Sequence, residues 1–502
     1  MTMNRGSVKA ITLAALCLAL FMTNLDDTVM NVALPKVQMS LGANVSGLQW
    51  ILNAYTLPAA SLMLMSGTLG DIYGRKRVFL SGLIVFTIAS LVCGLAPNLE
   101  VLIAGRTLQG IGAAPLVTGS LSILTDAFPK PEERAKAIGI WSGVSGLALV
   151  AGPALGGLLV DTLGWQSVFF LNVPLGFIAF GATSRVVRES KNPKKQRLDM
   201  PGFVLSVVLL TSLTCGVTQG NAGVWLLPIA GLSLLAFLVV ESHSSHPMLP
   251  LHLFKNSTFT VVNIVSILVF FTLVSLLFIF SLFLQQVQGY SAVAAGLRFL
   301  PLNGAFIIAS LVSGWFAVRL GWRFTIATGL VLASVATFSF VQLSADTEYG
   351  AIWWKLVLSG FGGGLTLSPL TAAAMNSAPP TQAGIASAVI NTSYRLGGIL
   401  GIALQGTILS QRLASNLRRA LTAWGLPSDL QDRLIADVLH GGTKVPSNLP
   451  TSITPLALHQ AISNAFVSGL HAAVFVASVA LLAGAFLILA FVHPTFKKRS
   501  PL

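Results

Sequence analysis

Ionisable side chains are rare in the long apolar segments of this chain, and those that occur there are the residues best suited to do chemistry. Those clearly inside the segments are two acids and three bases: Asp26, Asp27, Arg106, Lys355 and Arg395. A charge in apolar surroundings is costly, so it is usually paired or used for function. Burial favours the protonated form of a carboxyl group. A buried aspartate can therefore take up and release a proton.

Residue patterns typical of enzymes and metal sites are missing from the sequence. It contains no Gly-x-Ser-x-Gly, no His-Glu-x-x-His and no Walker loop, so we expect no enzyme and no ATP-driven pump. Three cysteines lie far apart in apolar segments: Cys17, Cys93 and Cys215. They suggest neither a disulfide framework nor a metal site. Three histidines fall in one Ser/Pro-rich stretch: His243, His246 and His252. Their spacing fits no zinc motif and indicates a plain loop.

The elements that position these charges must be membrane helices. Of the 502 residues, 54% are hydrophobic and only 9% are charged, and the mean hydropathy is +0.80. Soluble domains have about 25% charged residues, so this chain cannot cover a water-facing surface. Apolar runs long enough to cross a bilayer recur throughout. The sequence predicts an all-α integral membrane protein with fourteen transmembrane helices, near residues 10–34, 48–70, 78–96, 101–125, 137–160, 167–185, 201–220, 224–241, 257–284, 296–317, 324–344, 351–375, 385–409 and 466–492.

The ends of this predicted topology follow from the first span and the basic residues. The first run has no clear cleavage site, so we expect it to remain as a span. With the N-terminus inside, cytoplasmic segments hold about 20 Lys and Arg, whereas the short external loops hold essentially one, Lys36. The clusters are Arg75, Lys76 and Arg77, the run from Arg185 to Arg197, and Lys497, Lys498 and Arg499. We expect a multi-pass protein of the inner (cytoplasmic) membrane with both termini in the cytoplasm. The net charge of +14 comes from bases in short loops next to the spans, where they would face anionic lipids of the inner leaflet. We therefore do not interpret it as a sign of nucleic-acid binding.

An internal repeat predicts the domain organisation. Gly67 and Gly74-Arg75-Lys76 recur as Gly314 and Gly321-Trp322-Arg323, and Gly110-Ile-Gly112 recurs as Gly360-Phe-Gly362. Paired six-helix halves are common in secondary transporters. We predict an N-terminal half at 1–185, a linker with two inserted helices at 186–256, and a C-terminal half at 257–502. The last includes an external loop at 410–463. Apolar residues at helical spacing in its 411–440 portion suggest a helix on the outer membrane surface.

Four motifs in order along the chain resemble the major facilitator superfamily, and in particular its fourteen-span drug:proton antiporter family. They are residues 25–35 (LDDTVMNVALP), 67–77 (GTLGDIYGRKR), 106–112 (RTLQGIG) and 152–157 (GPALGG). The stretch from Asn391 to Gly398 also resembles a family segment. The resemblance implies the major facilitator fold and a proton-coupled antiporter, driven by the proton gradient without a cofactor, that exports small amphipathic compounds such as drugs.

The resemblance also implies which residues couple the proton. Asp26 matches the aspartate of the family's first-span element, whereas Asp27 occupies a variable position. Asp26 is therefore the expected proton carrier, and Arg106 the base that senses its charge. A structural ion pair between Asp26 and Arg106 is the alternative, and the two roles are compatible.

Two of the motifs are interpreted as gates. The first set comprises Gly67, Asp71, Gly74, Arg75, Lys76 and Arg134, with Asp71 expected to bind Arg134 or a helix N-terminus in one conformation only. The alternative is a topology anchor with a solvated Asp71. The second set comprises Gly152, Pro153, Gly156 and Gly157, which should bend the fifth span and let helices approach closely. A static packing notch is the alternative.

The expected substrate site is an aromatic, sparsely polar cavity. Its candidate residues are Asp27, Gln49, Trp50, Asn53, Tyr55, Asn391 and Arg395, although aromatic residues in spans more often serve packing. One acid is reserved for the proton, so divalent cations should be poor substrates and neutral, singly charged or anionic compounds good ones. Arg395 or Lys355 would pair with an anion, unless these bases face away from the cavity. An importer or passive facilitator of the same superfamily is the rival function. We expect a monomer, with protons and lipids as its other partners.

Overall fold

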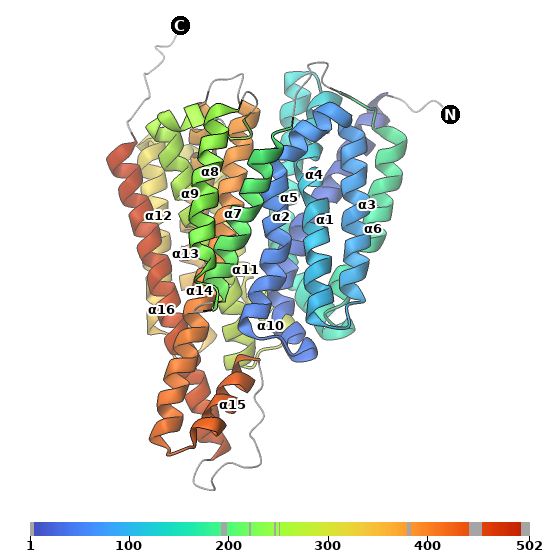
Figure 1. Cartoon of the computed structure of the whole chain (residues 1–502). Coiled ribbons are helices and arrows are strands. Elements are labelled where there is room, and N and C mark those ends of the chain that lie inside the picture. Colours follow the sequence, from blue (N-terminus) through green and yellow to red (C-terminus); the bar gives the residue numbers. More distant parts are fainter. Residues whose placement is uncertain are drawn as a thin grey trace.

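The computed structural model describes residues 5–191, 198–219, 222–244, 247–249, 251–378, 383–440 and 454–492. Within these residues the protein is a bundle of long helices without a strand (Figure 1). The predicted basic tail Lys497 to Arg499, His246 and part of the run from Arg185 to Arg197 lie outside the described residues.

Helix contacts divide most of the bundle into two groups. The first comprises α1 (Arg5–Leu41), α2 (Val45–Tyr73), α3 (Arg75–Gly94), α4 (Leu99–Ala127), α5 (Pro131–Leu163) and α6 (Ser167–Val186). Then come α7 (Met200–Thr218), α8 (Leu226–His243) and the short turn η2 (Leu251–Lys255). The second group begins with α9 (Ser257–Leu282), the π-helical turn η3 (Phe283–Val287), α10 (Ala292–Arg298), α11 (Leu300–Leu320) and α12 (Trp322–Ser339). It continues with the short turns η4 (Phe340–Gln342) and η5 (Tyr349–Ala351), and with α13 (Trp353–Asn376), α14 (Ala383–Ala423), α15 (Ser428–Leu439) and α16 (Pro455–Phe491).

Local chemistry explains where several of these helices begin. In an apolar solvent the backbone must satisfy its own hydrogen bonds, which favours helix throughout each apolar run. At the polar breaks, Asn and Asp side chains accept from the first free N–H groups of the next helix. Asn44 caps α2, Asn98 caps α4, Asp199 caps α7 and Asn256 caps α9.

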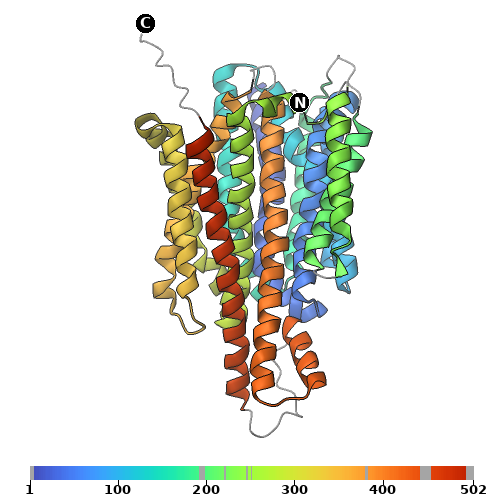
Figure 2. The same ribbon diagram turned by 60° about the vertical axis from the view of Figure 1, so that its left-hand side comes forward.

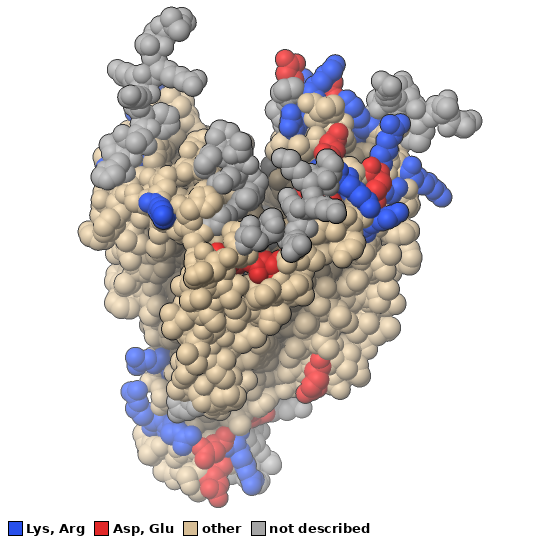
Figure 3. Space-filling view, turned by 45° about the horizontal axis from the view of Figure 1, so that its top comes forward, with Lys and Arg blue, Asp and Glu red and all other residues tan. Residues whose placement is uncertain are grey.

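Most of these helices are long and apolar enough to cross a membrane. Eleven pass that test within the described residues, and α5 makes a twelfth if its two parts count as one span. The parts of α5 meet at 41° between Ala148 and Val150, one turn before Pro153, as expected where proline removes a hydrogen bond. Figure 3 shows charged residues at both ends of the molecule and a broad belt of other residues between them. The chain is therefore a multi-pass membrane protein.

The internal repeat predicted from the glycines is visible in the packing. A Cβ atom on Gly112 would lie 2.5 Å from the backbone nitrogen of Phe86, so α4 and α3 touch backbone to backbone. A Cβ atom on Gly362 would lie 2.5 Å from the backbone nitrogen of Ala333, so α13 and α12 meet in the same way. Side chains at either glycine would separate these helices. The two groups thus use the same small-residue contact.

The two ends of the bundle differ in shape. Helix α1 begins and α16 ends at the same end of the bundle, called here the terminal end, and the opposite end is the distal end (Figure 1). At the terminal end the surface is hollowed between the two groups (Figure 3). Helix α7 contacts both α2 of the first group and α14 of the second. The pair α7 and α8 therefore flanks the boundary between the groups.

The predicted external loop at 410–463 is largely helical instead. Helix α14 continues unbroken to Ala423, α15 follows, and α16 already begins at Pro455, so these helices project beyond the bundle (Figure 2). The apolar stripe of this segment, including Leu417 and Leu421, is fully buried in a core shared with Leu434. The prediction that it lies on a membrane surface is wrong, because this stripe packs against protein.

Candidate functional site

A buried charge cluster lies inside the first helix group. Asp26 of α1 and Arg106 of α4 are each 1% exposed and form a salt bridge. The Arg106 guanidinium also donates to the carbonyl oxygen of Ile51 at 3.1 Å and to Oε1 of Gln109 at 2.8 Å. A buried pair is retained only when further hydrogen bonds satisfy both partners, and here they do.

Three polar side chains complete the surroundings of Asp26, and sequence reasoning had not named them as site residues. Gln109 and Asn172 donate to Oδ1 of Asp26 at 2.9 and 3.0 Å. Both also donate to the hydroxyl oxygen of Ser90, at 2.7 and 3.2 Å. The sequence did contain a clue to these three residues. Gln109 belongs to the 106–112 motif, and Ser90 and Asn172 are polar residues within apolar runs.

A second ion pair joins the two helix groups. Oδ2 of Asp27 accepts from Arg395 of α14 at 2.9 Å, and the two side chains are 28% and 17% exposed. Neighbouring residues on a helix point about 100° apart, which is why Asp27 leaves the Asp26 cluster and faces the other group. The Tyr55 ring links the pairs, since its centroid lies 4.3 Å from Cζ of Arg106 and 6.0 Å from Cζ of Arg395.

The other residues predicted to bind substrate differ in their surroundings. Gln49 is not free to do so, because its amide donates to the carbonyl oxygens of Ile402 and Ala403 at 2.8 Å. Trp50 packs in an apolar cluster at the contact of α2, α7 and α14. Asn53 is fully buried, and neither polar atom of its amide has a hydrogen-bond partner.

Asn391 is exposed, and its amide donates to the Ser387 carbonyl of its own helix at 2.8 Å. Lys355 is buried near the distal end, where its ammonium group donates to the carbonyl oxygen of Ser339 at 2.9 Å. In this conformation it therefore satisfies a carbonyl at the end of α12.

The 152–157 motif packs α5 against both groups. A Cβ atom on Gly156 would lie 2.6 Å from the Val29 side chain of α1, and one on Gly157 would lie 2.5 Å from the Ala292 carbonyl oxygen of α10. Further along α5, the Asp161 carboxylate accepts from the backbone N–H groups of Ala292 at 3.3 Å and Val293 at 2.9 Å. These contacts hold the groups together at the distal end.

Other contacts reinforce this distal closure. Gln285 of η3 donates to the Val32 carbonyl oxygen at 3.0 Å, and Gln286 donates to Oε1 of Gln38. The structure is thus closed at the distal end and hollowed at the terminal end.

The 67–77 motif forms a charge network at the terminal end. Gly74 has φ of +108°, a backbone conformation that favours glycine. A Cβ atom at this residue would collide with the Glu189 carboxylate. Arg75 binds Asp71 at 2.9 Å and Asp126 at 2.7 Å. Gly67 has open space around it.

The Asp71–Arg134 pair that the sequence predicted is not formed in this structure. The Arg134 guanidinium instead donates to the Pro129 carbonyl oxygen at 3.3 Å. Asp71 at the end of α2 takes Arg75 as its partner, which begins α3 directly after the turn at Gly74. Lys76 bonds elsewhere, its ammonium group donating to the Ser184 carbonyl oxygen at 2.7 Å.

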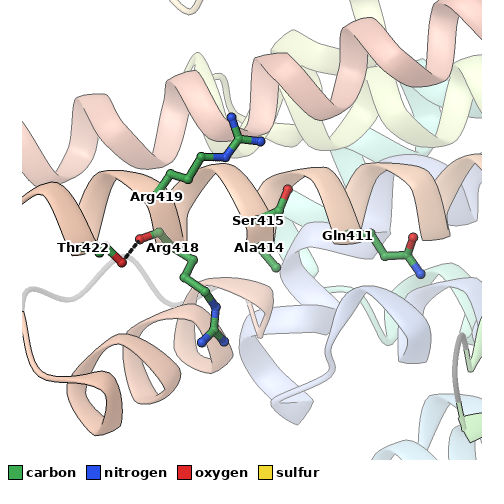
Figure 4. A pocket seen from close by; sticks show the side chains of 6 residues that line it. All are labelled: Gln411, Ala414, Ser415, Arg418, Arg419 and Thr422. Carbon is green, nitrogen blue, oxygen red and sulfur yellow. Dashed lines mark hydrogen bonds between the residues drawn. The ribbon is translucent and has the colours of Figure 1, made fainter.

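One pocket lies elsewhere, on α14, and is not the candidate site. It has a volume of about 560 Å³ and is lined by Gln411, Ala414, Ser415, Arg418, Arg419 and Thr422, all on one side of α14 (Figure 4). Most of these side chains are exposed, and Arg418 already pairs with Asp432 at 2.6 Å. An enclosed pocket of about 10 Å³ between the groups, beside Thr28 and Asn31, has room for about one water molecule. Among the described residues, no three His, Cys, Asp or Glu side chains are grouped to hold a metal ion.

Two packed helix groups, a hollow between them that is open at one end, and charge pairs at mid-depth define a membrane transporter. The sequence matches the Major Facilitator Superfamily profile over residues 16–402. The chain belongs to the major facilitator superfamily.

Similar proteins agree with this assignment. The multidrug resistance protein Stp of Mycobacterium tuberculosis is 34% identical over 95% of this chain and 91% of its own length. The tetracenomycin C resistance and export protein of Streptomyces glaucescens is 31% identical over 94% and 90%. A bacterial homologue of the human lysosomal transporter Spinster, solved in an inward-facing, unoccupied conformation, has a TM-score of 0.68 at 18% identity over 96% of this chain and 98% of its own. It has the same fold.

Proposed function

We propose that the protein is a proton-coupled antiporter that exports small amphipathic compounds, including drugs, across the cytoplasmic membrane by alternating access. The observation that most supports this is the contrast between two consecutive acids. Asp26 has its counter-ion inside the first helix group, whereas Asp27 has its counter-ion in the second. The names of the relatives, which are multidrug and antibiotic resistance or export proteins, favour export.

The proton step starts at Asp26. Protonation would remove the charge that Arg106 faces, and an unpaired buried charge is unfavourable by several kcal/mol. Arg106 also attracts Asp27, the next residue of α1. With Asp26 neutral, Arg106 would still attract Asp27, and the bond of Asp27 to Arg395 would weaken. Proton uptake in one group would thus loosen a contact between the groups.

Alternating access follows from this link. The closed distal end and the hollowed terminal end correspond to an inward-facing state if the terminal end is cytoplasmic, which the basic residues predict. The 152–157 motif and Asp161 would then form the external gate, and the Arg75 network would belong to the cytoplasmic gate. A substrate that entered the hollow would meet the partly exposed Asp27 and Arg395, so it would compete for the pair that joins the groups.

The pairing of charges also suggests which substrates fit. Both acids near mid-depth are paired with arginines, and Lys355 serves a backbone carbonyl. A second positive charge on a substrate would find no free partner. We therefore propose neutral, singly charged or anionic amphipathic substrates. In an efflux-deficient host, the chain should protect against mono-quaternary but not matched bis-quaternary compounds, and strong protection against both would refute this.

The remaining topology is part of the same proposal. Besides the eleven apolar helices and the bent α5, the long helices α2 and α14 also run through the bundle. Counting them gives fourteen spans, an even number that leaves both termini in the cytoplasm. The first half would end at residue 185 and the second would begin at 257, with α7 and α8 inserted between them.

The experiment that tests the function measures uptake of a fluorescent substrate by energised everted vesicles. The native chain should accumulate substrate, and a protonophore should abolish accumulation. Asp26→Asn should lose proton-driven uptake, whereas Asp27→Asn should keep part of it. Removing one partner of a buried pair costs about 3–5 kcal/mol, so membrane insertion and monodispersity are measured first for each variant.

Two outcomes would contradict the proposal. Full proton-driven uptake by well-folded Asp26→Asn would exclude this residue as the proton carrier. Uptake that does not respond to the protonophore would favour a passive facilitator, and proton-driven movement in the opposite direction would favour an importer.

A further inference from the structure

Two acidic side chains outside the central cluster meet at the terminal end of the inserted helices. Asp199 immediately precedes α7, and Glu241 lies in the last turn of α8. They are 8% and 3% exposed. Sequence reasoning passed over both, because each lies at the edge of an apolar run beside polar linker residues.

One oxygen of each carboxylate already has a backbone partner. Oδ1 of Asp199 accepts from the N–H group of Gly202 at 2.9 Å, which caps α7. Oε2 of Glu241 accepts from the N–H group of Leu249 at 3.0 Å, which holds the segment after α8. These bonds fix the two side chains in place.

The other two oxygens face the same point and have no partner. A Cβ atom built on Gly202 would lie 2.7 Å from Oε1 of Glu241 and 2.9 Å from Oδ2 of Asp199. Both oxygens are buried without a hydrogen-bond partner. Both oxygens therefore lie beside Gly202, and two ionised carboxylates that are buried so near each other repel and lose their hydration, so both cannot be charged.

None of the salt bridges among residues 5–191, 198–219, 222–244, 247–249, 251–378, 383–440 and 454–492 involves either acid. Helix α7 has no ionisable residue other than Cys215. On α8, the His243 ring contacts Ser242 and Val239 of its own helix. The segment that follows includes His252 and Lys255 in η2.

We propose that Asp199 and Glu241 form a second proton-binding site, in which one proton is shared between Oε1 of Glu241 and Oδ2 of Asp199. One carboxyl group then donates to the other, and both orphan oxygens are satisfied. The proton joins the start of α7 to the end of α8 and, through Leu249, to the segment that leads into the second helix group. This site is independent of proton coupling at Asp26.

The position of the site gives it a consequence for the whole molecule. Helix α7 contacts both groups, and Thr407 of α14 donates to the carbonyl oxygen of Val217 at 3.1 Å. Loss of the shared proton restores two facing negative charges and pushes α7 and α8 apart at the terminal end. The contact between α7 and α8 at the terminal end is therefore strongest at low pH, where the shared proton is bound.

Infrared spectroscopy of the purified full-length protein tests the site directly. The native protein at neutral pH should show a band of a protonated buried carboxyl group that disappears as the pH rises. Glu241→Gln and Asp199→Asn should each remove this band, whereas Asp432→Asn, which alters an exposed acid on the distal extension, should keep it. Samples in sodium, choline and calcium chloride should give the same band.

A thermal denaturation series provides the second measurement. At neutral pH the native state holds a proton that the unfolded chain has already lost, so Tm should fall as pH rises. Glu241→Gln should keep a high Tm at every pH, because its amide donates permanently to Asp199. Glu241→Leu should have a lower Tm at low pH.

Several results would overturn the proposal. An infrared band that persists in Glu241→Gln and in Asp199→Asn would place the proton elsewhere. The absence of any such band in the native protein would mean that both acids are ionised and neutralised by another cation. A band that appears only when sodium or calcium is removed would show that a metal cation, rather than a proton, occupies the site.

Discussion

The ion pair between Asp27 and Arg395 should hold the two helix groups in the distally closed arrangement, and Asp27→Asn tests this. Removing one partner of a fully buried pair costs about 3–5 kcal/mol, whereas an exposed pair contributes less than about 1 kcal/mol. With side chains 28% and 17% exposed, this pair lies between those limits. We expect a shift of about 1–3 kcal/mol towards the distally open arrangement, which is about 5- to 150-fold in population.

Distances between two distal spin labels measure this shift. Leu95 at the end of α3 and Asp346 before α13 are exposed in different groups and can both be labelled after replacement of the native cysteines. Asp27→Asn should increase the fraction of long distances. Asp432→Asn is the matched control, because it breaks an exposed pair of similar length on the distal extension.

The exchanged pair Asp27→Arg with Arg395→Asp separates charge from side-chain size. It restores an ion pair between the same helices, so it should return the distances towards the native distribution. The reasoning is refuted if Asp27→Asn leaves the distances unchanged, or if the exchanged pair gives the same distances as Asp27→Asn.

Two further predictions concern glycines. Gly74→Ala should lower Tm and transport, because the residue has φ of +108° and a Cβ atom would lie 2.6 Å from the Glu189 carboxylate, whereas Gly67→Ala should behave as native because its surroundings are open. Equal Tm and transport for the two variants would show that this turn tolerates a side chain. Gly157→Ala should impair distal closure, since its Cβ atom would lie 2.5 Å from the Ala292 carbonyl oxygen. Crosslinking between α5 and α10 should then decrease, and unchanged crosslinking would contradict the predicted role of this contact.

Much of the architecture was predictable because it depends on local composition. Apolar runs without charge form helices in a membrane, and the polar residues between them cap those helices. The glycines of the 152–157 motif predicted where helices meet, as Gly156 and Gly157 do, since a missing side chain permits close approach. The scarcity of intramembrane charge also singled out Asp26 and Arg106, which the structure joins.

Sequence reasoning failed where a residue's partner depends on distant parts of the chain. Asp71 was expected to bind Arg134 or a helix N-terminus in one conformation, and in this conformation its partner is Arg75, across the turn at Gly74. Gln49 was read as a cavity residue, but its amide bonds carbonyl groups 353 and 354 positions later. The 411–440 portion was expected to be a helix on the membrane surface, but its apolar stripe packs against other helices of the protein.

The sequence by itself determined that this protein lies in a membrane, that it is helical, that it repeats a unit, and that a few charges lie inside. These properties follow from the free energy of placing each residue type in lipid or water. Only the tertiary structure decided that Asp26 pairs within one group while Asp27 pairs with Arg395, 368 positions away, in the other. The 100° turn between consecutive helical residues separates the two acids. Where each acid then finds its counter-ion depends on how the two groups pack.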